Sequence, residues 1–79
     1  MITLKNIVIS NNSITCDAYI EDSKKPTKLV LNTESKELSP YALPPGYDWC
    51  TSHIIKAKDY LISLIGETNN SKEKRIIWY

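Results

Sequence analysis

The sequence of 79 residues predicts an α+β domain in which an antiparallel-rich, four-stranded sheet is covered on one face by a single amphipathic helix. Aliphatic segments separated by turn residues fill residues 2–33, and apolar residues recur at helical spacing over residues 50–65. Residues 74–79 are again rich in apolar side chains. The expected order is three strands, a helix and a strand, and residues 1–79 form one domain because so short a chain builds a single core.

The first strand, residues 2–9, needs an irregularity to bury its apolar side chains on one face. These side chains alternate regularly on either side of residues 5–6 but change face across them, so we expect a β-bulge there. After a polar turn, residues 14–20 alternate strictly and form the second strand. A third strand over residues 27–33 completes a meander. The side chains expected to face the core are Ile14, Cys16, Ala18, Ile20, Leu29 and Leu31.

Residues 34–49 are rich in proline and aromatic residues, and they predict an ordered surface loop. The helix then begins at an N-cap supplied by Asp48, Thr51 or Ser52. It ends at Gly66, because glycine tolerates the positive φ that follows many helices. Its expected apolar stripe consists of Cys50, Ile54, Ala57, Leu61, Leu64 and Ile65.

The last strand, residues 74–79, has two possible neighbours. It pairs beside the first strand if the helix runs back across the meander, and this arrangement places all apolar faces in one two-layer structure. Pairing on the third strand is the competing topology. The direction of the last strand depends on the path of the long loop, which the sequence leaves open.

The composition sets several function classes aside. Ten basic residues stand against nine acidic residues, so the chain lacks the basic excess of most nucleic-acid binders, and a weak nucleic-acid-binding module remains only as an alternative. No apolar run approaches the length of a membrane helix and no signal-peptide core follows Met1, so we expect a cytoplasmic protein with no membrane partner. Glu21 and Asp22 lie in a charged turn and are expected to be solvated.

The segment Tyr-Asp-Trp-Cys-Thr-Ser-His, residues 47–53, is the most suggestive candidate in the sequence for a reactive or metal-binding site. Cys50 and His53 share a helical face, so they could form a thiol nucleophile with its base. With Cys16, and with Asp48 as a forced fourth ligand, they could instead bind a metal ion. A purely structural role is the stronger interpretation. Cys50 lies on the apolar stripe, where a free cysteine behaves as a small buried hydrophobic residue. A structural zinc site also requires four ligands, usually in paired motifs with short spacing. We therefore expect no catalytic site, no metal site and no cofactor.

Aromatic residues lead to the preferred hypothesis, a non-enzymatic protein-binding or regulatory module. The proline-rich loop beside the helix start could present Tyr41, Tyr47 and Trp49 together, and such rings are enriched at binding hot spots. For the large rings of Trp49 and Trp78, burial in the core is the favoured interpretation. A homodimer formed by pairing of strand edges is a related alternative. The candidate binding residues are Tyr41, Tyr47, Asp48, Trp49, Cys50 and His53.

Overall fold

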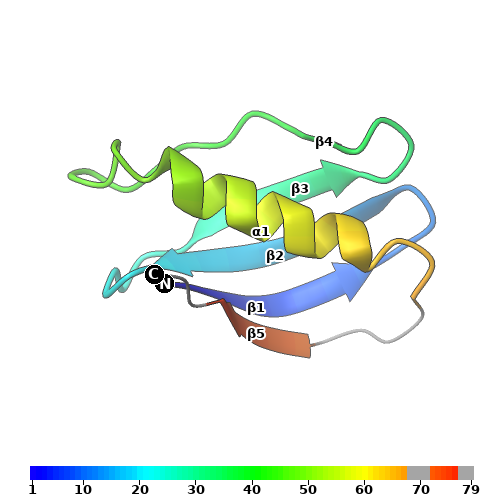
Figure 1. The fold of residues 1–79 in the computed structure, drawn as a ribbon, viewed down its shortest axis with the longest axis horizontal. Helices are drawn as coiled ribbons and strands as arrows, with labels where there is room; N and C mark the ends of the chain where they lie inside the picture. The colour runs from blue at the N-terminus through cyan, green and yellow to red at the C-terminus, as the bar shows by residue number, and fades with distance from the viewer. Residues whose placement is uncertain (68–71, 77–79) are drawn as a thin grey trace.

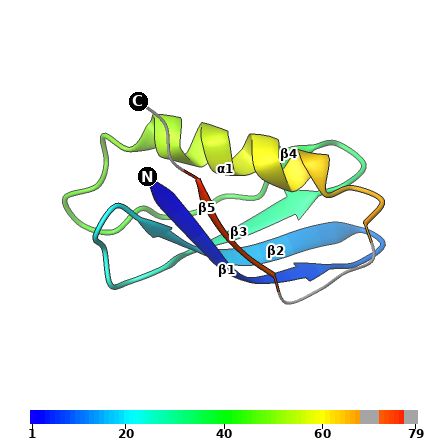
Figure 2. The same ribbon diagram turned by 60° about the horizontal axis from the view of Figure 1, so that its bottom comes forward.

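The computed structural model describes residues 1–67 and 72–76, and within them a helix lies across one face of a sheet (Figure 1). Figure 2 shows the two layers from another side. All neighbouring strands are antiparallel, and their order is β4-β3-β2-β1-β5. The predicted fold class is confirmed. The elements are β1 (Ile2–Ile9), β2 (Ser13–Ile20), β3 (Thr27–Asn32), β4 (Glu37–Leu38), α1 (Thr51–Ser63) and β5 (Lys72–Ile76).

The sheet has five strands in place of the four predicted. The additional strand, β4, lies inside the segment predicted to be loop, and its two residues are too few to show alternation. A tight turn sends the chain back along β3: the backbone N–H of Lys36, which has φ +61°, donates to the carbonyl of Asn32 at 2.8 Å. The side-chain oxygen of Asn32 also accepts from the backbone N–H of Glu34 and that of Ser35.

Of the two neighbours that the sequence left open, the last strand pairs beside β1, and it runs antiparallel to β1. Its bounds differ from the prediction, because β5 begins at Lys72 instead of residue 74. Residues 77–79 lie outside the described residues, and so does the expected burial of Trp78.

The predicted bulge in β1 is present between Lys5 and Val8, where the register with β2 shifts. Asn6 has φ +54°, a left-handed conformation that asparagine tolerates better than most residues, and its amide donates to Asp17 Oδ2 at 2.9 Å. The bulge brings the apolar side chains on both of its sides to the helix-covered face: Ile2, Leu4 and Ile7 are all fully buried.

The helix α1 buries the stripe that its sequence predicts, with Ile65 half-buried at its end. The prediction of an N-cap at Asp48, Thr51 or Ser52 is wrong. Cys50 occupies that position, where its thiol is buried in the core and makes no side-chain capping bond. Gly66, with φ +93°, follows the helix as expected. No helix within the described residues is long and apolar enough to span a membrane.

The sheet face opposite the helix carries a row of alternating charges across four strands. The register sets Lys5 opposite Asp17 and Asp17 opposite Lys28. Lys5 Nζ also lies 3.5 Å from Glu73 Oε1, and Lys28 Nζ lies 3.7 Å from Asp17 Oδ1. Opposite charges in adjacent cross-strand positions each contribute a fraction of a kcal/mol, so the row favours this register over a slipped one.

Adjacent isoleucines in α1 provide a test of which helix face packs on the sheet. Ile54 is 3% exposed and Ile55 is 57% exposed. We expect Ile54→Val to lower the free energy of unfolding by about 1 kcal/mol, because it removes a buried methyl group. Ile55→Val should leave this free energy within about 0.5 kcal/mol of wild type. Urea denaturation measures both changes, and equal losses would contradict the placement of the helix.

The charge row provides a second test, through Asp17→Lys. This substitution places three cations side by side, and we expect it to lower the free energy of unfolding by about 1 to 2 kcal/mol. The loss should shrink at high salt, because exposed charges are screened. Asp59→Lys changes the net charge equally on the exposed helix face and serves as the control. A loss of the same size in both variants would show that position in the row does not matter.

Candidate functional site

The proline-rich segment before α1 is folded by its own sequence. Tyr47 N–H donates to the carbonyl of Pro44 at 3.0 Å, and Gly46 has φ +86°. These are the features of a type II β-turn with Pro45 and Gly46 as its central residues, a turn in which proline sets the first φ and glycine permits the positive second φ. A second turn follows, in which Cys50 N–H donates to the carbonyl of Tyr47 at 3.0 Å. The loop reaches the helix at the same end of the molecule as the turn between β2 and β3 (Figure 1).

A hydrogen bond between His53 and Glu21 joins the first turn of α1 to the end of β2. His53 is 5% exposed, and its Nε2 lies 2.6 Å from Glu21 Oε1. The same carboxylate oxygen accepts from the α-amino group of Met1 at 3.1 Å. The bond from His53, followed by the bond from the amino group, lowers the pKa of Glu21 below its ordinary value. Since an ionised carboxylate only accepts hydrogen bonds, Nε2–H of His53 is the donor.

The expectation that Glu21 and Asp22 are solvated is incomplete for both, because the Glu21 side chain is 39% exposed and yet hydrogen-bonded to His53 and to the amino group of Met1. Asp22 is exposed, but its Oδ1 accepts from the hydroxyl of Tyr47 at 2.8 Å. This bond and the burial of the phenol raise the pKa of Tyr47. Two consecutive carboxylates at the end of β2 therefore bind two residues of the helix-start segment. A sequence offers no signal for this pairing, because the partners lie 25 and 32 residues apart.

Trp49 is exposed, contrary to the prediction that it fills the core. Its side chain is 67% exposed, and Cys50, the next residue, takes the buried position at the helix start. The indole is nevertheless held in place, because its Nε1–H donates to the carbonyl of Gly46 at 2.9 Å. Its ring also meets the His53 ring edge-to-face, with centroids 5.8 Å apart and planes at 84°. Such pairs are favourable beyond the area they bury.

Cys50 lacks the environment of a reactive thiol. It is fully buried, and its pKa is raised by burial and then by the nearby Glu21 carboxylate. A nucleophilic cysteine needs the opposite conditions, an accessible thiol with a lowered pKa. Cys16 is also fully buried, and burial is the largest cause that raises its pKa to about 12. Among residues 1–67 and 72–76, no three Cys, His, Asp or Glu side chains lie together as a group that could hold a metal ion.

The structure brings only part of the predicted set together. Contacts link Tyr47, Trp49 and His53 to one another or to the carboxylates at the end of β2. Tyr41 and Asp48 are exposed, and no hydrogen bond or ring contact in the described part of the chain joins them to this group. We call the connected set the helix-start cluster; it consists of Glu21, Asp22, Tyr47, Trp49 and His53.

A groove of about 370 Å³ lies beside the helix-start cluster, between the turn after β2 and the turn before α1. The Asp22–Tyr47 hydrogen bond connects its two walls. We call it the proline groove; it is lined by Asp22, Ser23, Lys24, Lys25, Pro44, Pro45 and Tyr47.

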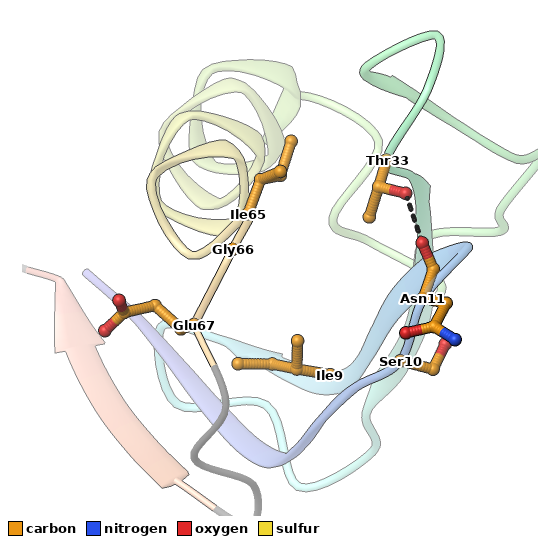
Figure 3. A pocket seen from close by; sticks show the side chains of 7 residues that line it. All are labelled: Ile9, Ser10, Asn11, Thr33, Ile65, Gly66 and Glu67. Atoms are coloured by element: carbon orange, nitrogen blue, oxygen red, sulfur yellow. Dashed lines mark hydrogen bonds between the residues drawn. The ribbon is translucent and has the colours of Figure 1, made fainter.

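A second hollow, of about 250 Å³, lies at the other end of α1 (Figure 3). Ile65 and Gly66 line it from the helix end and Ile9 from β1, while the hydroxyl of Thr33 donates to the carbonyl of Asn11 at 3.1 Å on its far side. Its one titratable lining residue is Glu67. The proline groove, with its charges and fixed rings, is the stronger candidate site.

No protein-family model, curated protein or solved structure matches the chain. What the helix-start cluster can do therefore follows from its own geometry. That geometry combines two held aromatic rings, one of them largely in solvent, with a groove whose walls are joined by a hydrogen bond.

The lowered pKa of Glu21 predicts a pH-dependent contribution to stability. Because the folded protein favours the ionised carboxylate, this contribution is present above the ordinary value of 4.5 and is lost as pH falls through the folded-state pKa. We expect Glu21→Gln to destabilise the protein at pH 7, and the difference from wild type to shrink as the pH is lowered below 4.5 and through the folded-state pKa of Glu21. Urea unfolding across this range measures the difference. Glu67→Gln is the control, and a Glu21→Gln deficit that stays constant with pH would contradict the assignment.

The burial of both cysteines predicts slow alkylation of the folded protein. Iodoacetamide should modify Cys16 and Cys50 far more slowly in buffer than in denaturing urea, because each thiol becomes accessible only when the structure opens. Mass spectrometry of tryptic peptides distinguishes the two sites. Rapid modification of Cys50 alone in the folded protein would show an accessible thiol and revive the nucleophile hypothesis.

Proposed function

We propose that this protein is a non-enzymatic, cytoplasmic protein-binding module whose contact surface centres on Trp49. The observation that carries the proposal is an indole that is 67% exposed and yet fixed by a hydrogen bond and a ring contact. A large ring that is already ordered loses little conformational entropy when a partner covers it. Tryptophan and tyrosine are also the residues that most often dominate binding energies at protein interfaces.

The surroundings of Trp49 support the same function. Its indole is bound to Gly46, which stands between two groove-lining residues, Pro45 and Tyr47. The ring is therefore hydrogen-bonded to the turn that lines the groove, which supports a contact surface that includes both. The two hydrogen bonds made by Glu21 and Asp22 hold this surface on the body of the domain. The buried free thiols also suit a reducing compartment.

The other candidate partners receive less support from the geometry. Four of the five residues of the edge strand β5 are charged, and charged edge strands discourage pairing with a second sheet. The open sheet face alternates positive and negative side chains, whereas nucleic-acid binding requires a continuous basic surface. These features favour neither an edge-paired homodimer nor a nucleic-acid-binding module.

The proposal is tested by affinity capture from a lysate of the source organism, followed by affinity measurements on purified partners. Trp49→Ala should weaken direct binding of a captured protein about 30-fold, the loss expected for a hot-spot residue. It should change the free energy of unfolding by only about 1 kcal/mol or less, because the ring is mostly exposed.

Ile55→Ala provides the matched control for apolar surface. Ile55 is 57% exposed and lies two residues, or about 200° around the helix, from His53. Binding by this variant should equal that of wild type. Partners whose affinity is the same for wild type and Trp49→Ala would contradict the proposed surface.

A further inference from the structure

The proline groove has two walls that are ordered before any ligand binds. One wall is the turn after β2, where Ser23 N–H donates to the carbonyl of Ile20 at 2.9 Å and Ser23 Oγ donates to the carbonyl of Lys25 at 3.0 Å. The other wall is the type II turn that ends at Tyr47. The Asp22–Tyr47 bond, 2.8 Å long, fixes the separation of the walls. A groove of this kind can select a ligand by shape and charge.

The carboxylates beside the groove have hydrogen-bond partners, whereas its two lysines have no ion-pair partner in the described part of the chain. The carboxylate of Asp22 already accepts the Tyr47 hydroxyl, and the neighbouring Glu21 carboxylate accepts from His53 and from the amino group of Met1. Lys24 and Lys25 are exposed, and in the described part of the chain neither ammonium group has a carboxylate within ion-pair distance. The groove therefore presents two cations that have no ion-pair partner among residues 1–67 and 72–76.

The rest of the lining is apolar in character. Pro44 and Pro45, which have no backbone N–H donors, line the groove together with the half-buried Tyr47. A compact anion such as inorganic phosphate would leave these surfaces uncovered. A peptide can cover them with one side chain while its carboxylates approach the lysines, because extended chains place successive side chains on opposite sides.

We propose that the proline groove binds an acidic peptide segment that carries a large apolar side chain. The carboxylates of the segment pair with Lys24 and Lys25, and its apolar side chain packs on Pro44, Pro45 and Tyr47. The chain continues over Trp49, beside the groove. This inference rests on the proposed protein-binding function, and it specifies the chemistry of the partner.

Selection from a phage-displayed library of random dodecapeptides tests the inference with the full chain as bait. Enriched peptides should contain aspartate or glutamate together with leucine, phenylalanine or tryptophan. Fluorescence anisotropy of a labelled synthetic copy then measures affinity. The double variant Lys24→Glu/Lys25→Glu should weaken binding about 10-fold or more, and wild-type binding should weaken as salt rises.

A second double variant, Lys56→Glu/Lys58→Glu, changes the net charge by the same amount on the helix and should bind as wild type does. The inference is overturned if no acidic peptides are enriched, or if the two double variants lose affinity equally. Peptides that lose affinity with Trp49→Ala but are indifferent to reversal of Lys24 and Lys25 would overturn the acidic ligand and leave the proposed function standing. Peptides indifferent to Trp49→Ala would contradict both.

Glycine provides a further test of preorganisation in the same assay. Gly46 and Gly66 both have positive φ, and an added Cβ would meet no atom within 4 Å at either position. Each glycine-to-alanine substitution should therefore cost about 1 kcal/mol of stability through backbone strain alone. Only Gly46→Ala should also weaken the selected peptides, because relief of the backbone strain would shift the turn whose residue-46 carbonyl accepts from the Trp49 indole. Equal affinities in the two variants would show that the turn does not position the binding surface.

Discussion

The hydrogen bond between His53 and Glu21 determines where the helix begins on the sheet. His53 is almost wholly buried, and a buried imidazole without a polar partner would be costly. Its partner extends from the end of β2, so the first turn of α1 stays beside that end at a distance of 2.6 Å. Cys50 reinforces this position from the apolar side, because its thiol is fully buried in the core. Any sliding of the helix along the sheet would break the hydrogen bond and expose Cys50 together.

The same constraint creates the candidate binding surface. Once the helix start is held near β2, Asp22 comes within hydrogen-bond distance of the Tyr47 hydroxyl, and this bond connects the two walls of the proline groove. The His53 ring, immobilised by Glu21, offers its surface to Trp49 for an edge-to-face contact. Stability and recognition therefore share residues in this small domain. A chain with so few core residues has little other rigid structure on which to build a site.

The sheet face away from the helix carries charged side chains that pair with one another. Its central row alternates in charge from Glu73 through Lys5 and Asp17 to Lys28, and each cation has a partner of opposite sign. These pairs support strand register and keep the exposed layer hydrophilic, while β5 ends the sheet with a charged edge. Lys24 and Lys25, at the groove, are cations to which the structure gives no such partner. The contrast is the reason for assigning recognition to the groove and not to the sheet.

Local periodicity in the sequence determined much of the fold. Strict alternation defined β2, a change of face at residues 5–6 required the bulge, and apolar spacing defined the helix stripe, because each depends on neighbours a few residues away. Only the tertiary structure decided that Glu21 is bound to His53 and that Trp49 stays in solvent. These outcomes depend on how the helix crosses the sheet, which brings together residues 32 positions apart. Local patterns carry no information about contacts between residues so far apart in the chain. The sequence therefore indicated which segment contains the site, and the packing of the helix on the sheet decided which of its side chains are exposed.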